Sequence, residues 1–127
     1  MENQKKTVLI VEDEVVLSNI LKDKLEGENF LVSTAKNGEE GLSTALNTKP
    51  DLILLDIIMP KMDGIEMLKK MREDAWGKNV RVLLLTNDSN PDHMRESLKD
   101  NAVDYLIKSD WNLDEVVKKI RTRLEMN

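Results

Sequence analysis

A regular alternation between two apolar patterns constrains the fold of this chain more than any other feature, and it continues through all 127 residues. Short apolar runs of strand-like character are each followed by a segment in which apolar residues recur every three or four positions, the spacing of a helix. Such an order predicts an α/β fold, a parallel sheet covered by helices. We expect strands at residues 7–11, 30–34, 52–55, 80–85 and 103–107.

Five helices are expected after these strands, and several have recognisable ends. Gly27 suits the left-handed position that closes a first helix. Asn37 and Glu40 form a capping-box pattern before the second. Gly64 permits an unusual backbone conformation at the start of the third, and residues 90–91 place a cap and a proline before the fourth. The apolar positions that define the helices are Leu17, Ile20, Leu21 and Leu25; Leu42, Ala45 and Leu46; Ile65, Leu68 and Met71; Met94 and Leu98; and Leu113, Val116, Val117, Ile120 and Leu124.

The polarity of the strands predicts their order in the sheet. Runs 7–11, 52–55 and 80–85 are almost continuously apolar, as expected for strands buried on both faces. Runs 30–34 and 103–107 alternate apolar and polar residues, which is typical of edges. With right-handed crossovers, this pattern favours a doubly wound, flavodoxin-like (βα)5 sheet of order 2-1-3-4-5, whose switch point lies between strands one and three.

Composition excludes several classes of function. With 19 Lys and Arg against 24 Asp and Glu, the net charge of −5 speaks against nucleic-acid binding through the overall field. The absence of cysteine and the single histidine, His93, exclude disulfides, thiolate sites and multi-histidine metal sites. No apolar run approaches the roughly 18 residues of a membrane span, and the first residues lack a signal-peptide pattern. We therefore expect one cytoplasmic domain that does not enter a membrane.

Polar residues follow four of the predicted strands at the edge where doubly wound sheets bind ligands. Glu12 and Asp13 follow the first strand, Asp56 the third, Thr86 the fourth and Lys108 the fifth. Each alone has an ordinary explanation, such as a helix cap or an exposed charge. Together, three carboxylates in one cleft need a cation to remain ionised side by side, and oxygen ligands suit Mg²⁺.

These positions, together with the runs 56–64 and 104–108, resemble the receiver domain of bacterial response regulators, in order and with the spacing of that family across essentially the whole chain. The resemblance implies that Asp56 accepts a phosphoryl group from a sensor histidine kinase or a phosphotransfer protein. It also implies that Mg²⁺ is bound by Asp13 directly, by Glu12 largely through water, by Asp56 and by the backbone carbonyl of Ile58.

The remaining roles are implied by the same resemblance. Lys108 would pair with the phosphoryl oxygens and the Thr86 hydroxyl would hydrogen-bond one of them. Tyr105 would be the aromatic that turns inward when Thr86 moves. The chain, residues 1–127, would be a single receiver domain without an attached output domain. It would be a phosphoacceptor switch that assists its own phosphorylation and dephosphorylation, rather than an enzyme, and would signal to a downstream protein, or form a phosphorylation-dependent homodimer, through its helix 4, strand 5 and helix 5 face.

Two positions depart from the family pattern. Ser109 follows Lys108 where most receivers have proline, and Asn87 follows Thr86 where a small residue is usual. Because a cis bond before a non-proline residue costs roughly 3–4 kcal/mol, we expect a trans Lys108–Ser109 bond, with Trp111 as a packing anchor for a rearranged loop. Asn87 is expected to alter the lifetime of the phosphate.

Other functions fit less well. A degenerate receiver that binds partners without phosphorylation is the main alternative, and an excised receiver from a longer protein is another. A haloacid dehalogenase-type phosphatase needs a second aspartate where Ile58 stands. A dinucleotide site needs a glycine-rich loop after strand one, where two acids follow instead.

Overall fold

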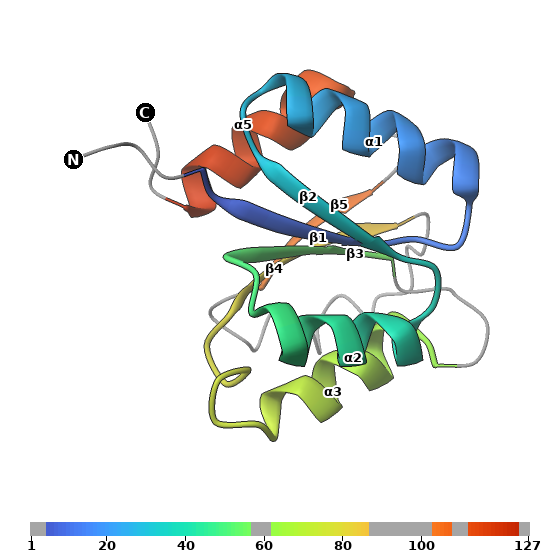
Figure 1. The fold of residues 1–127 in the computed structure, drawn as a ribbon, viewed down its shortest axis with the longest axis vertical. Helices are drawn as coiled ribbons and strands as arrows, with labels where there is room; N and C mark the ends of the chain where they lie inside the picture. The colour runs from blue at the N-terminus through green and yellow to red at the C-terminus, as the bar shows by residue number, and fades with distance from the viewer. Residues whose placement is uncertain (1–4, 57–61, 87–102, 108–111, 125–127) are drawn as a thin grey trace.

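The computed structural model describes residues 5–56, 62–86, 103–107 and 112–124, in which strands and helices alternate (Figure 1). The elements are β1 (Thr7–Val11), α1 (Val15–Gly27), β2 (Leu31–Ala35), α2 (Gly38–Thr48), β3 (Leu52–Leu55), α3 (Gly64–Arg72), β4 (Arg81–Thr86), β5 (Val103–Ile107) and α5 (Leu113–Arg123). The helix expected after residues 90–91 lies outside the described residues. No described helix is long and apolar enough to span a membrane.

The strands form one parallel sheet in the order β2-β1-β3-β4-β5, which confirms the predicted topology. Val8 of β1 lies opposite Val32 of β2 on one side and Leu52 of β3 on the other. The helices α1 and α5 cover one face of the sheet, and α2 and α3 cover the other (Figure 1). The switch point between β1 and β3 is therefore where the sequence analysis placed it.

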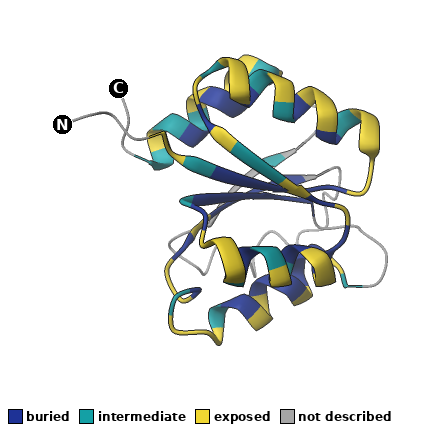
Figure 2. Ribbon diagram, in the orientation of Figure 1, coloured by how far each residue is buried: buried dark blue, intermediate teal, exposed yellow. Residues whose placement is uncertain are grey.

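Two apolar clusters fill the space between the sheet and its helices. Because successive side chains of a strand point to opposite faces, β1 contributes to both clusters. Val8 and Ile10 pack in the cluster that includes Leu21 and Leu25 of α1. Leu9 and Val11 pack in the cluster that includes Ala45 of α2 and Met67 and Met71 of α3. The fully buried inner strands, dark in Figure 2, confirm that their continuous apolar runs reflect burial on both faces.

The start of α2 confirms half of the predicted capping box. The Asn37 side chain accepts a hydrogen bond from the Glu40 N–H at 2.8 Å, as predicted. The Glu40 carboxylate accepts from the Lys36 N–H at 3.0 Å, although a capping box would direct it to the N–H of Asn37. Two hydrogen bonds therefore stabilise the start of α2, and one of them joins its first turn to Lys36, the residue after β2.

Two predictions about glycine were wrong. Helix α1 includes Gly27, and the left-handed residue that follows it is Asn29, with a φ of 77°. Asparagine tolerates this conformation, so the left-handed position falls two residues after the end of the helix and not at Gly27. Gly64 does not have a positive φ. It is the buried first residue of α3. The preceding residue, Asp63, is the N-cap of that helix, and its side chain accepts from the Glu66 N–H at 2.9 Å.

The remaining differences from the predicted elements are small. Strand β2 begins at Leu31, because Phe30 precedes the strand as a buried core residue, and β4 extends to Thr86. Ile20, predicted to mark the inner face of α1, is 45% exposed and so belongs to its outer face. The packing role predicted for Met62, Met67 and Met71 is confirmed, whereas Met59 lies outside the described residues.

Charged side chains join α1 to α5. Lys24 lies 2.9 Å from the carboxylate of Asp114 and 3.5 Å from that of Glu28. Its hydrogen bond to Asp114 raises the pKa of Lys24, because the carboxylate favours the charged ammonium. Arg121 donates to the carbonyl and the carboxylate of Glu28, and its guanidinium lies 5.5 Å from the ring centre of Phe30. These contacts fix α5 against the carboxyl end of α1.

Candidate functional site

The carboxyl ends of β1 and β3 place three carboxylates at one edge of the sheet. Val11 lies opposite Leu55 in the ladder, so the residues after each strand come out beside one another. The Asp56 N–H donates to the Val11 carbonyl at 3.0 Å, and the Glu12 N–H donates to the Ala35 carbonyl at 3.0 Å. The parallel ladder thus extends one residue into the site and fixes the backbone from which Glu12 and Asp56 project.

Glu12, Asp13 and Asp56 form an acidic cluster. One carboxylate oxygen from each residue can be chosen so that all three lie within 4.8 Å of one another. Glu12 is 4% exposed and Asp56 6% exposed, whereas Asp13 is exposed and leaves the cluster open on its side. The Glu12 carboxylate also accepts from the Glu14 N–H at 3.2 Å, at the entrance to α1. The sequence analysis predicted this grouping, and the described part of the chain bears it out.

The chemistry of the cluster suits a hard divalent cation. All three donors are carboxylate oxygens, which Mg²⁺ and Ca²⁺ prefer, and an open side allows water or a phosphate oxygen to complete the coordination. Two carboxylates that are almost fully buried next to each other are costly without a compensating positive charge. A bound cation would offset that cost and would attract an anionic substrate to Asp56.

Two further predicted residues are placed only through the backbone. Thr86 ends β4 and pairs with Ile107 of β5, at the same edge of the sheet as the acidic cluster. Tyr105 lies within β5 and pairs with Leu84. The side chains of Thr86 and Tyr105 are not described. Ile58, Lys108, Asn87 and Ser109 lie outside the described residues, so their predicted roles and the trans Lys108–Ser109 bond stay predictions.

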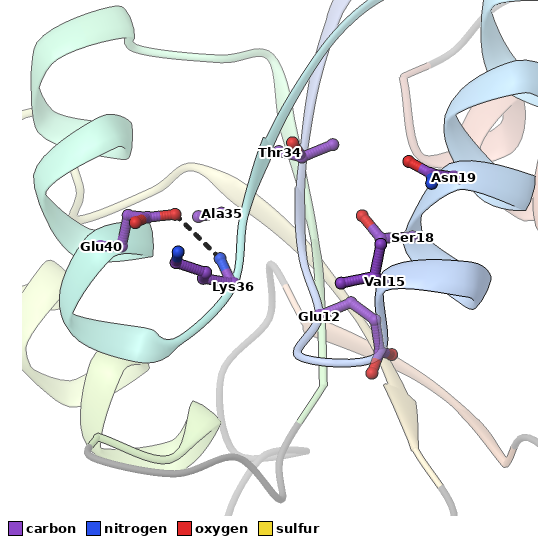
Figure 3. Close-up of a pocket in the computed structure, with 8 residues that line it drawn as sticks. All are labelled: Glu12, Val15, Ser18, Asn19, Thr34, Ala35, Lys36 and Glu40. Atoms are coloured by element: carbon purple, nitrogen blue, oxygen red, sulfur yellow. Dashed lines mark hydrogen bonds between the residues drawn. The ribbon is translucent and has the colours of Figure 1, made fainter.

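A polar cavity of about 240 Å³ adjoins the cluster, and the sequence analysis did not foresee it. Figure 3 shows residues of α1 along one side, the end of β2 in the middle and α2 along the other side. Its lining residues are Glu12, Val15, Ser18, Asn19, Thr34, Ala35, Lys36 and Glu40. No local motif marks such a cavity, because its walls come from three elements that are brought together only by the fold. Glu12 belongs to both the cavity and the cluster.

The start of α1 exposes apolar side chains directly after the cluster. Val15 is 66% exposed and Val16 is 73% exposed, and Ile20 continues this surface along the helix. Apolar side chains grouped on a surface commonly mark a contact with another protein. The only comparable exposed residue elsewhere among the described residues is Leu31, at the opposite end of the edge strand β2.

Comparison with known proteins identifies the family. The family model of the response regulator receiver domain matches residues 8–121. The chain is 36% identical over 124 residues to the uncharacterized transcriptional regulatory protein YkoG of Bacillus subtilis, covering 98% of this chain and 53% of that protein. It is 30% identical over 127 residues to the DNA-binding response regulator MtrA of Mycobacterium tuberculosis, covering all of this chain and 54% of MtrA. The chain thus spans about half the length of these curated relatives.

A solved structure of similar size agrees with this assignment. The CheY-like response regulator receiver domain protein of Methanospirillum hungatei superposes with a TM-score of 0.88 at 29% sequence identity. The match covers 96% of this chain and 95% of that chain. The likeness therefore extends over almost the whole length of both chains.

Proposed function

Because this chain belongs to the response regulator receiver family, we propose that it accepts a phosphoryl group on Asp56 from a histidine kinase or a phosphotransfer protein. The observation that carries this proposal is the acidic cluster. Asp56 is almost fully buried at the end of β3, with oxygens of Glu12 and Asp13 close enough to share one cation with it. The family makes a phosphoacceptor the expected use of that arrangement.

In the proposed reaction, an oxygen of Asp56 attacks the phosphorus of a phosphohistidine. The bond from phosphorus to the imidazole nitrogen breaks, and an aspartyl phosphate forms. Such transfers depend mainly on positioning and on charge neutralisation around the phosphoryl oxygens. Mg²⁺ held by the carboxylates of the cluster would supply part of that neutralisation. Lys108 pairs with the phosphoryl oxygens, and the Thr86 hydroxyl donates a hydrogen bond to one of them.

The residues proposed to hold Mg²⁺ are Asp13 and Asp56 directly, Glu12 largely through water, and the backbone carbonyl of Ile58. Glu12 is buried and its carboxylate already accepts the Glu14 N–H, which supports indirect binding of Mg²⁺ through water. The exposed position of Asp13 leaves it free to reach a hydrated ion at the open side of the cluster.

The phosphodonor protein is proposed to contact the start of α1. Its phosphohistidine must come within bonding distance of Asp56, so the surface around the cluster has to meet the donor. Val15 and Val16 are the most exposed large apolar side chains among the described residues, and they follow Asp13 within the same turn. Burial of these side chains under the donor would contribute to binding.

The output of the switch is proposed to pass through strand β5 and helix α5, together with the residues at 91–99. Pairing of Leu84 with Tyr105 and of Thr86 with Ile107 places the two proposed switch residues on neighbouring strands. A displacement of Thr86 toward a phosphoryl group can therefore be relayed to Tyr105. The altered face then binds a downstream protein or a second copy of this chain, in place of an enzymatic output.

Reductive trapping tests the acceptor. The protein is incubated with acetyl phosphate with and without Mg²⁺ and then treated with borohydride, which converts an aspartyl phosphate to homoserine. Peptide mass spectrometry should find homoserine at position 56 only after incubation with Mg²⁺. Trapping at another aspartate would contradict the assignment, and no trapping at any residue would favour a degenerate receiver.

A further inference from the structure

The backbone of Gly38 lies unusually close to the residue that ends the connection between β3 and α3. The Gly38 N–H donates to the Met62 carbonyl at 3.0 Å. Gly38 is the first residue of α2, and the first N–H groups of a helix have no acceptor within the helix. The Met62 carbonyl therefore satisfies a donor that is buried and that would otherwise lack a partner.

Only glycine fits this contact. A Cβ added at position 38 would overlap the Met62 carbonyl oxygen, and it would lie 2.9 Å from the carbonyl carbon and 3.0 Å from the Met62 Cβ. The obstacle is mainly backbone, which cannot move aside as the end of a flexible side chain can. Gly38 does not have a positive φ, so glycine is required by the close approach and not by the backbone conformation.

This contact fixes one end of the connection that leaves Asp56. At its other end, the Asp56 N–H is held by the Val11 carbonyl, directly before Glu12. Only residues 57–61 separate Asp56 from Met62. Helix α2 is capped by Asn37 and packs against the sheet through the buried Ala45. The two described residues that flank this connection are thus each held by a backbone hydrogen bond, Asp56 by β1 and Met62 by α2.

We infer that Gly38 is a positioning residue for the reaction at Asp56. By allowing the backbone of α2 to approach Met62, it holds the residue at which the chain that leaves Asp56 reaches α3. This inference rests on the proposed function. It concerns a residue that touches neither the metal nor the phosphoryl group, so its effect must pass through the Gly38–Met62 hydrogen bond.

The test is Gly38→Ala, with Mg²⁺ binding measured by titration calorimetry and phosphorylation measured with acetyl phosphate. The added methyl group displaces Met62, so Mg²⁺ affinity should fall about tenfold, the lower end of the loss seen when outer residues that orient metal ligands are removed. Labelling at subsaturating Mg²⁺ should slow in proportion. Saturating Mg²⁺ should restore part of the rate.

Gly77→Ala is the matched control. A Cβ at Gly77 would overlap the Met71 carbonyl oxygen in the same way, but Gly77 lies between α3 and β4, at the amino ends of the strands and away from the cluster. Both variants should lose stability in urea denaturation, while Gly77→Ala should bind Mg²⁺ as the parent does. Equal Mg²⁺ affinity in Gly38→Ala and Gly77→Ala would overturn the inference and leave Gly38 a packing residue.

A second variant tests the inference if Gly38→Ala does not fold. Replacement of Gly38 by glycolic acid exchanges the N–H for oxygen and adds no side chain, so it removes the hydrogen bond alone. This ester should also weaken Mg²⁺ binding, and unchanged affinity would overturn the inference. The Mg²⁺ titration is separate from labelling. A parent protein that binds Mg²⁺ but is never phosphorylated would contradict the proposed function, whereas the effect of Gly38 on Mg²⁺ would still be decided.

Discussion

At the scale of single residues, Asp13 differs from its two neighbours in the acidic cluster. Glu12 and Asp56 are buried, whereas Asp13 is exposed. Asp13 does not cap a helix, since the N-cap of α1 is Glu14. Among the described contacts, none gives Asp13 a structural role that would require an acid. This favours a role for its carboxylate in binding a cation.

Asp13→Ala should weaken Mg²⁺ binding at least tenfold and slow phosphorylation with it, because one of three carboxylates is lost. It should also stabilise the metal-free protein by up to about 1 kcal/mol, the size of the repulsion between two charges about 4 Å apart in a water-like medium. Calorimetric Mg²⁺ titration and urea denaturation measure the two effects.

Asp23→Ala, which removes an exposed charge from the middle of α1, is the control and should leave Mg²⁺ binding unchanged. If metal-free Asp13→Ala is instead clearly less stable than the parent, Asp13 supports the start of α1 after all. Unaltered Mg²⁺ affinity would remove it from the proposed ligands.

At the scale of elements, α1 combines two surfaces with different purposes. Its inner face carries Leu21 and Leu25 into the core, and its carboxyl end is tied to α5 through Lys24 and Glu28. Its amino end exposes Val15 and Val16 beside the cluster. An element so firmly held at one end offers a rigid platform for a partner at the other.

Val16→Lys should lower phosphotransfer from a histidine kinase that phosphorylates the parent protein by about tenfold in kcat/KM, a cost typical of a lost contact at an interface. Labelling by acetyl phosphate should not change, since a small donor needs no docking surface. Both rates are measured from the appearance of phosphorylated protein.

Leu31→Lys places the same charge at the other exposed apolar position, on the far end of β2, and should affect neither rate. Equal losses in Val16→Lys and Leu31→Lys would attribute the effect to charge alone. Loss of acetyl phosphate labelling in Val16→Lys would show damage to the site itself.

Periodicity predicted most elements because their burial is local in origin. The runs at β1 and β3 and the positions of Met71 in α3 and Ile120 in α5 are buried as the pattern indicated. The left-handed position after α1 was assigned to the wrong residue, because Asn29 takes the conformation expected of Gly27. The second half of the predicted capping box does not form, because the Glu40 carboxylate accepts from the Lys36 N–H instead.

Part of the site was likewise predictable from the sequence and part was not. The three carboxylates were predictable because the ends of parallel strands fall at one edge. The Gly38–Met62 contact and the polar cavity were not, since both depend on how α2 packs against segments distant in sequence. No spacing within the sequence records such an approach.

At the scale of the whole molecule, the sheet connects the site to the proposed output face. Strand β4 lies between β3, which leads to Asp56, and β5, which leads toward α5. A phosphoryl group at Asp56 can bias that face only by making contacts that differ between two states of the protein. Thr86, at the end of β4, is proposed to make such a contact.

Amide NMR spectra with Mg²⁺ and beryllofluoride, a phosphoryl mimic, should show shift changes at Thr86, across residues 104–106 and along 112–124. They should also reach residues 91–99. Asp51 and Trp76, at the amino ends of the strands, serve as internal controls and should remain unchanged. Changes limited to Glu12, Asp13 and Asp56 would mean that no switch reaches this face.

The central claim is that Asp56 is the Mg²⁺-dependent phosphoacceptor, and intact mass after incubation with acetyl phosphate tests it most directly. The parent protein should gain one phosphoryl group with Mg²⁺ and none without it, and Asp56→Asn should gain none. Asp51→Asn is the matched control at the other end of β3, where Asp51 accepts the Thr7 N–H at 2.8 Å, and it should be labelled like the parent. Stoichiometric labelling of Asp56→Asn would contradict the claim.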